Sequence, residues 1–384
     1  MKFLILSSFL IPFGSFMVLP FVPILLTRHN HMDMAAVGWV LGFASLIQFG
    51  GGFIGGVVAE RLGLKRTMLL ALTVRTLGFA LLLASLERAD WLIPAVIIIA
   101  TGAALYLPAN KAYIVNAVPV SERPLFLSLS SSALNAGMAM GPLVGGLFLL
   151  GNSEVLFWVI FVVFVVLTLA HWAFVDSAAQ VSKHPPRAGK VSYLKLMGVP
   201  FALNALAFYG YFFFQNYMGP YTTSLHSAGL YGGLLTVNAL LVFFGQPLLS
   251  KVIAEASYRA SMFFSFMMLS LSMYFLSIGS VWALIVGTVM ITFAEMVLFL
   301  KGDLEILNAV PDKPAFAFGM QRLSAGLGAF VSALIGGALY DYMQNNQQLG
   351  TFWSVLAIQA LVVAVVVLAV LSFKRKLAVV NSQA

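Results

Sequence analysis

The chain of 384 residues contains no cysteine and very few charged side chains. Without cysteine, a disulfide framework and a thiolate metal site are excluded. Charged residues make up only 9% of the chain, whereas hydrophobic residues make up 61%. An ordinary soluble domain has roughly 25% charged residues. Because the surface of a soluble globule needs more charge than this, the composition excludes a soluble enzyme, a nucleic-acid-binding protein and a disordered chain.

Motifs for catalysis and for ATP-driven work are also missing from the sequence. It has no Walker loop, so ATP is not the expected energy source. No cluster of His, Asp and Glu has the spacing of metal ligands, and no nucleophile lies beside a base. We therefore expect neither an enzyme nor a protein with a bound metal or cofactor.

What the sequence does contain is a series of apolar runs long enough to cross a bilayer, which takes about 20 residues per helix. The first begins directly after Lys2 and is too long for the apolar region of a signal peptide. The twelve runs are 4–27, 35–58, 66–86, 91–112, 125–150, 154–174, 199–223, 229–251, 260–279, 281–303, 317–340 and 350–373. The sequence thus predicts an all-α polytopic membrane protein with twelve transmembrane helices.

The distribution of basic residues predicts the orientation. With the N-terminus inside, eighteen of the 21 Lys and Arg residues fall on the inner side, whereas Arg28 and Arg88 lie in outer loops. Arg75 lies within a span. Because basic residues concentrate in cytoplasmic loops, both termini are expected in the cytoplasm and the net charge of +8 is attributed to those loops. The expected location is the cytoplasmic (inner) membrane, with the lipid bilayer as a partner and no nucleic acid.

The two halves of the chain look like repeats. Asn-Ala-Val-Pro occurs at 116–119 and again at 308–311, and the glycines of the fifth span recur in the eleventh span at nearly the same offset. We expect two pseudo-symmetric six-helix bundles, 1–174 and 198–384, joined by a polar cytoplasmic linker at 175–197. Two like-oriented halves around a central site are typical of transporters.

Two segments carry motifs. The loop after the second span contains Gly56, Glu60, Arg61, Gly63, Lys65 and Arg66, and the fifth span contains Gly137, Gly141, Pro142, Gly145 and Gly146. Glu60 can accept hydrogen bonds at the N-terminus of a neighbouring helix. Glycines four residues apart form a smooth helical stripe, which suits helices that slide or simply pack closely.

The loop resembles the signature of the major facilitator superfamily, with Glu60 in place of the usual aspartate. The glycine stripe resembles the motif of the drug:proton antiporters, which is seen in exporters and is mostly absent from importers. Those exporters usually carry an arginine four residues before a glycine of the fourth span, but here Ile98 precedes Gly102. The resemblance covers the whole chain and implies a transporter of the major facilitator fold that mostly works as a monomer.

Two charged residues lie deep in predicted spans, where ionisable groups are costly and usually functional. Glu295 is our candidate for the proton-coupling residue, with a structural glutamate as the alternative. Arg75 is either an anchor for an anionic group or a fixed clamp between helices. By the resemblance, Glu295 faces the central cavity. The other candidates for the substrate cavity are polar, aromatic or Met residues of spans four, seven and ten: Tyr106, Asn110, Tyr209, Gln215, Asn216, Met296 and Phe299.

The repeat also predicts a cytoplasmic gate. Lys111 and Asp303 occupy equivalent positions in the two halves, so we expect them to pair when the inner mouth is closed, or else to be solvated helix ends. Glu122 is expected either to join Glu60, Arg61 and Arg66 in a latch or to be solvated.

Together these features predict a transporter that exports an amphipathic small molecule in exchange for protons by alternating access. A dedicated exporter of one secreted metabolite, such as a siderophore, is the first alternative, and a proton-coupled importer is the second. A channel fits the sequence poorly, because it would need a continuous polar pore.

Overall fold

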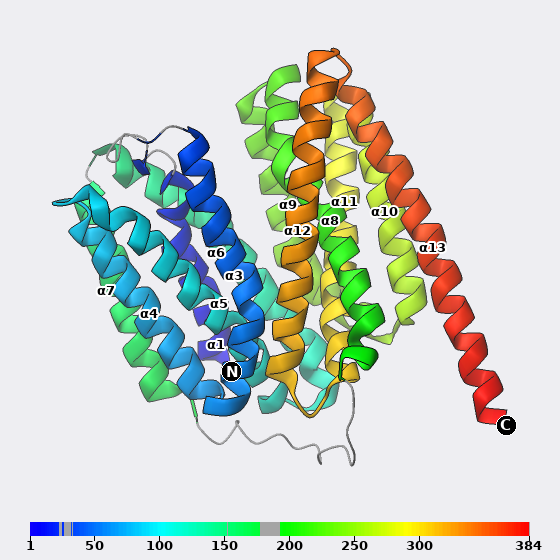
Figure 1. Cartoon of the computed structure of the whole chain (residues 1–384), viewed down its shortest axis with the longest axis horizontal. Helices are drawn as coiled ribbons and strands as arrows, with labels where there is room; N and C mark the ends of the chain where they lie inside the picture. The colour runs from blue at the N-terminus through cyan, green and yellow to red at the C-terminus, as the bar shows by residue number, and fades with distance from the viewer. Residues whose placement is uncertain (23–24, 27–31, 33, 152, 177–192, 384) are drawn as a thin grey trace. The chain divides into compact units, whose positions relative to one another are not determined.

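The computed structural model describes the whole chain except residues 23–24, 27–31, 33, 152, 177–192 and 384. Throughout these described ranges the secondary structure is helical (Figure 1). The α-helices are α1 (Lys2–Phe16), α3 (Met34–Leu62), α4 (Leu64–Ala84), α5 (Leu92–Ala117), α6 (Arg123–Gly151), α7 (Ser153–Phe174), α8 (Tyr193–Leu225), α9 (Ala228–Glu255), α10 (Tyr258–Ile278), α11 (Val281–Ala309), α12 (Pro314–Asn345) and α13 (Leu349–Gln383).

The helices correspond one to one to the predicted spans, but α1 ends at Phe16, before the predicted end at residue 27, and a short 3-10 helix (Leu19–Phe21) follows it. Eleven helices in the described part of the chain are long and apolar enough to cross a membrane. The remaining one, α6, has 29 residues and corresponds to the predicted span at 125–150. The side chains at 146–150, near its end, lie outside the described residues. The prediction of a twelve-helix membrane fold is confirmed, whereas the orientation of the termini stays a prediction.

Glycines end helices at two very short connections. Gly63 separates α3 from α4 with a φ of 90°, and Gly279 closes α10 with a φ of 73°. Residues other than glycine rarely adopt this left-handed region. These two glycines explain how consecutive long helices are joined by almost no loop.

The chain forms two compact units. Unit 1 comprises Met1–Met197 and Ile306–Gly326, and unit 2 comprises Gly198–Glu305 and Leu327–Ala384. In unit 1, α1 packs on α6, α5 packs on α3 and α4, and α4 also packs on α7; in unit 2, α10 packs on α13. The end of α11 and the start of α12 thus group with unit 1. The predicted boundaries at 174 and 197 stay a prediction, and residues 177–192 of the linker lie outside the described residues.

The predicted glycine stripes lie at close helix contacts. In unit 1, Gly137 of α6 lies against the backbone of Phe9 in α1, and a β-carbon at Gly141 would be 2.7 Å from the carbonyl oxygen of Phe13. In unit 2, Gly328 of α12 lies against the backbone of Ala205 in α8. Two further motif residues are in α6: Pro142 lies inside the helix, and the surroundings of Gly146 lie outside the described residues. Small residues here allow two helix backbones to touch.

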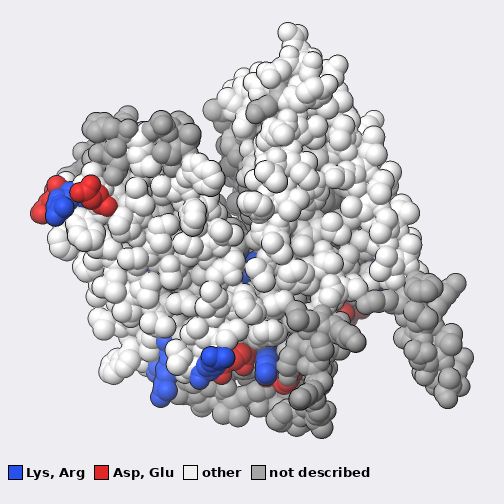
Figure 2. Space-filling model, viewed as in Figure 1, with Lys and Arg blue, Asp and Glu red and all other residues white. Residues whose placement is uncertain are grey.

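The outer surface suits a lipid environment. Trp39 is 74% exposed and Leu248 is 80% exposed. Many other large apolar side chains are also exposed. Figure 2 shows charged side chains near the ends of the unit 1 helices and almost none between them on the viewed face. At one end, Arg88 and Asp90 form an exposed ion pair of 3.6 Å. An uncharged band between charged ends is what a membrane protein requires.

Candidate functional site

Unit 1 encloses a cavity of about 480 Å³. Its walls come from α1, α3, α4, α5, α6 and the start of α12. The polar lining residues are Ser8, Ser15, Ser45, Gln48, Arg75, Tyr106, Asn110 and Arg322, and most of the other lining side chains are apolar. This volume falls in the range of roughly 300–1,000 Å³ typical of small-molecule sites.

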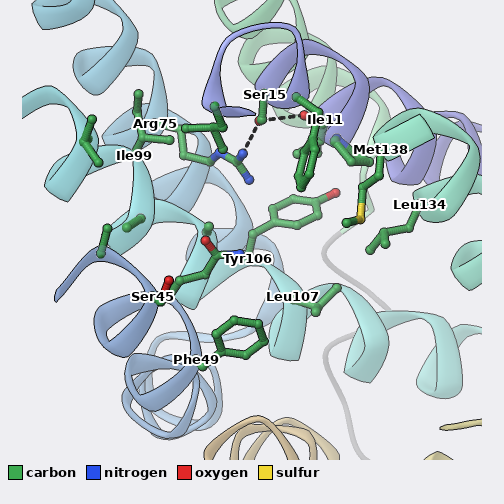
Figure 3. Close-up of a pocket in the computed structure, with 18 of the residues that line it drawn as sticks. Ile11, Ser15, Ser45, Phe49, Arg75, Ile99, Tyr106, Leu107, Leu134 and Met138 are labelled. Atoms are coloured by element: carbon green, nitrogen blue, oxygen red, sulfur yellow. Dashed lines mark hydrogen bonds between the residues drawn. The ribbon is translucent and has the colours of Figure 1, made fainter. Parts of the chain in front are cut away.

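Arg75 brings a buried positive charge to the cavity wall. Its side chain is only 6% exposed, and the guanidinium donates a hydrogen bond to the hydroxyl of Ser15, as Figure 3 shows. Ser15 in turn donates to the carbonyl of Ile11 at 2.8 Å. The guanidinium carbon lies 5.1 Å from the ring centre of Phe164, a cation–π contact. Gly102 of α5 makes room for this side chain, because a β-carbon there would collide with it.

Arg75 is not fully satisfied by these contacts. Among the described residues its Nε has no hydrogen-bond partner, and no carboxylate lies within ion-pair distance. The structure places Arg75 on a cavity wall, so both the anchor and the clamp between helices stay open to it.

Tyr106 and Asn110 lie on the same cavity, one helical turn apart on α5. Both are buried. The hydroxyl of Tyr106 lies 2.9 Å from Nε2 of His171, and Nδ1 of His171 lies 2.8 Å from the carbonyl oxygen of Leu167. The carbonyl can only accept, so Nδ1 carries the proton and Nε2 accepts from Tyr106. His171 therefore positions a cavity residue.

Arg322 is a cavity residue that the sequence-based prediction does not include. It comes from the start of α12 and lines the cavity, and its guanidinium carbon lies 4.4 Å from the ring centre of Phe49. A β-carbon at Gly52 would be 2.6 Å from the β-carbon of Arg322, so the glycine permits this close approach. The place of Arg322 within the apolar run 317–340 is the signal that could have found it.

Unit 2 contains a buried polar cluster around Glu295. The side-chain amide of Asn238 donates to Oε2 of Glu295 at 3.1 Å and to Oγ1 of Thr292 at 2.8 Å. The hydroxyl of Tyr211 also interacts with Glu295, and Gln215 donates to that hydroxyl at 2.5 Å. The cluster thus joins α8, α9 and α11. Asn238, which with Gln246 is one of two side-chain amides in the run 229–251, is a member of the cluster that the sequence-based prediction does not include.

The remaining unit 2 candidates surround this cluster or lie apart from it. Phe299 stacks on Phe208 with ring centres 4.6 Å apart. Met296 is buried, with its sulfur close to Gly245. Tyr209 exchanges hydrogen bonds with Gln359. Asn216 is exposed. Their role in a substrate cavity stays a prediction.

The signature loop is tied to the start of α12 within unit 1. Oε1 of Glu60 accepts hydrogen bonds from the backbone N–H groups of Ala315 and Phe316, at 2.9 and 3.2 Å. Gly56 lies against the backbone of Ala315, so the two helices touch. A carboxylate at a helix N-terminus satisfies free N–H groups and complements the helix dipole. Glu60 therefore acts as a cap contributed by a different helix.

Other charged candidates are placed individually. Glu60, Arg61 and Gly63 line a shallow depression, and Arg66 and Glu122 are exposed. Lys65 is partly buried, and Lys111 lies 5.5 Å from the ring centre of Phe318. Lys111 belongs to unit 1 and Asp303 to unit 2, so their pairing stays a prediction, as does a latch with Glu122. In the ranges that the structure describes, no three His, Asp or Glu side chains are grouped as metal ligands.

Comparison with known proteins agrees with this architecture. The Major Facilitator Superfamily profile matches residues 4–223. The "Multidrug resistance protein MdtH" of Proteus mirabilis is 32% identical over 158 residues, which is 41% of this chain and 39% of that protein. This alignment thus spans about two-fifths of the relative. The MdtH of Edwardsiella ictaluri is 26% identical over 375 residues, covering 93% of this chain and 90% of that protein.

Solved structures with little sequence identity share the fold. The human organic anion transporter MFSD10 (TETRAN) has a TM-score of 0.73 at 16% identity, covering 94% of this chain and 98% of that chain. The Escherichia coli fucose:proton symporter FucP has a TM-score of 0.72 at 14% identity, covering 96% and 97%. With the profile match over more than half of its length, the chain belongs to the Major Facilitator Superfamily, a family of membrane transporters.

Proposed function

We propose that the protein exports an amphipathic small molecule from the cytoplasm in exchange for protons. The observation that carries this proposal is the cavity of about 480 Å³, which combines apolar walls with a buried arginine in a chain of this superfamily. The relatives named for multidrug resistance support an exporter, and so does the glycine–proline stripe of α6.

Glu295 is the proposed proton site. A carboxyl group buried among Asn238, Thr292 and Tyr211 can exist in either protonation state, because an amide donor serves a carboxylate and a carboxylic acid alike. Removal of the charge by protonation lowers the cost of keeping this side chain away from water. Proton uptake from one side and release to the other would therefore bias the transporter between its two access states.

Other parts of the proposal follow from the sequence. The protein works in the cytoplasmic membrane as a monomer, with both termini inside and with no cofactor other than the proton gradient. Gating involves Lys111 and Asp303, and the signature loop with Glu60 supports the cytoplasmic side. Chain duplication supplies the two halves that rock around the substrate site.

Two alternatives remain within the same superfamily. The first is a dedicated exporter of one secreted metabolite. The second is a proton-coupled importer, and the likeness to a fucose:proton symporter is the observation that favours keeping it. The direction of proton movement relative to substrate separates antiport from symport.

The test is transport in proteoliposomes with an imposed pH gradient and a pH-sensitive dye. The proposal expects substrate to move against the proton, so that an alkaline shift in one compartment accompanies substrate arrival there. Co-movement of substrate and proton in the same direction would replace antiport with symport. Uphill transport that is indifferent to the pH gradient would remove proton coupling altogether.

A further inference from the structure

We propose that the unit 1 cavity selects amphipathic organic anions, with Arg75 as the anchor of the anionic group. This inference rests on the proposed function, since it names the substrate class of that transporter. It depends on three observations within unit 1, namely the charge of the lining, the unsatisfied state of Arg75 and the apolar character of the remaining walls.

The lining of the cavity is positively charged. It includes two guanidinium groups, those of Arg75 and Arg322, and no Asp or Glu among the lining residues that the structure describes. The neutral polar groups around them, such as Gln48 and Ser45, can donate hydrogen bonds to an oxyanion. A cation in this cavity would meet like charge and, among the lining residues that the structure describes, no carboxylate, so the lining discriminates against cationic compounds.

Arg75 has spare capacity for a ligand. A guanidinium carries five N–H donors in a planar fork, and one of them is used by Ser15. Its Nε is buried without a partner in the described part of the chain, and Phe164 covers one face of the group. A buried charge with no counter-charge is costly, and an incoming carboxylate or sulfonate would satisfy it through two parallel hydrogen bonds.

The rest of the cavity accommodates an apolar body. In Figure 3, Ile11, Ile99, Leu107, Leu134 and Met138 surround the space near Arg75 and Tyr106. Branched aliphatic side chains and the flexible thioether favour an aromatic or aliphatic ring system over a sugar. The expected substrate therefore has one acidic group at the end of a hydrophobic skeleton.

Anion export would also couple to the membrane potential. An anion that leaves and a proton that enters both make the interior of the cell more positive. An interior-negative potential therefore drives both movements. A cation exchanged for one proton would move no net charge. The stimulation of transport by an interior-negative potential is therefore a second signature of the substrate class.

The test compares two probes of nearly the same shape on the purified full chain in lipid nanodiscs. The probes are radiolabelled 1-naphthylacetate, which is an anion, and its neutral amide, 1-naphthylacetamide. We expect the acid to bind at least about tenfold more tightly than the amide, as for one desolvated charge-assisted contact. Arg75→Gln should abolish this preference, and Arg75→Lys should keep part of it. Arg88→Gln, which changes an exposed arginine outside the cavity, should leave it intact.

The outcomes separate this inference from the proposed function. Equal binding of acid and amide by the unmodified protein would overturn the inference, and so would a preference that persists in correctly folded Arg75→Gln. If Arg75→Gln does not fold, the relative binding of the acid and the amide by the unmodified protein still tests whether the cavity prefers anions. Selective acid binding without proton-driven transport of the acid in proteoliposomes would overturn the proposed function alone. Proton-driven transport of cations with no acid preference would overturn the inference alone.

Discussion

The side-chain amide of Asn238 in α9 donates a hydrogen bond of 3.1 Å to the carboxyl group of Glu295 in α11. The same amide donates to Thr292, one turn earlier on α11, at 2.8 Å. One donation holds the carboxyl group and the other holds the hydroxyl of Thr292, so the amide ties α9 to α11 without adding a charge. A neutral setting of this kind leaves the protonation state of Glu295 open to change, which is what a proton-coupling residue needs.

Replacement of Glu295 by glutamine tests this role. The amide is close in size and still accepts from Asn238, but it cannot exchange a proton. We expect Glu295→Gln to bind substrate and to lose uphill transport driven by a pH gradient, because no proton can then be carried in exchange for the substrate. Substrate-induced proton release, followed with a pH-sensitive dye in proteoliposomes, should fall to background. Glu87→Gln, a change at an exposed glutamate, should behave like the unmodified protein. Persistent uphill transport in Glu295→Gln would show that another residue carries the proton.

The pair formed by Tyr106 and His171 allows a second prediction. The two side chains are buried and joined at 2.9 Å, so removal of the Tyr106 hydroxyl leaves the acceptor nitrogen of His171 without its partner. We expect Tyr106→Phe to lower the free energy of unfolding by about 1–3 kcal/mol, the usual cost of an unpaired buried polar group. Thermal unfolding in detergent measures the change.

A double-mutant cycle separates this hydrogen bond from other effects. With His171→Leu as the second change, the Tyr106→Phe substitution should cost much less, because no orphaned nitrogen is left. The coupling energy should lie between about 0.5 and 3 kcal/mol. Strictly additive effects would show that the hydrogen bond contributes nothing to stability.

Much of this architecture could be predicted from local sequence. Runs of apolar residues set the helices, because each crossing needs a fixed length of apolar chain. Arg75 stood out because a lone charge in a span is costly, and Tyr106 and Asn110 stood out because their polar atoms need partners. The structure brings all three to one cavity.

The unpredicted part depends on contacts between residues far apart in the chain. Asn238 meets Glu295 across 57 residues, and no local pattern indicates which helix faces which. Arg322 reaches the cavity because the start of α12 packs on α3 through Gly52 and Gly56. Glycine stripes indicate that some close contact exists, but they do not name the partner helix.

Glu60 provides a third prediction, since it caps α12 from a neighbouring helix. Glu60→Ala removes the acceptor of the Ala315 and Phe316 N–H groups, so the free energy of unfolding should fall by about 1 kcal/mol, as for other helix caps. Glu60→Asp should recover part of this loss, because the shorter side chain keeps the carboxylate. Glu87→Ala is the exposed control. Denaturant unfolding compares the three variants, and equal stability of Glu60→Ala and Glu87→Ala would show that the cap is unimportant.

The contact between α6 and α1 gives the last prediction. A β-carbon at Gly141 would lie 2.7 Å from the carbonyl oxygen of Phe13 and 2.8 Å from the β-carbon of Phe16, both closer than real side chains approach. The two helices must therefore separate in Gly141→Ala, and overpacking of this kind costs about 1–3 kcal/mol. Gly42→Ala is the matched control, because a β-carbon at Gly42 of α3 meets no atom within 4 Å. The control should be neutral or gain up to about 1 kcal/mol from the higher helix propensity of alanine. In thermal unfolding in detergent, Gly141→Ala should therefore unfold at a lower temperature than the unmodified protein. Gly42→Ala should unfold at the same temperature as the unmodified protein or at a higher one. If both unfold at the same temperature, the stripe does not hold α6 against α1.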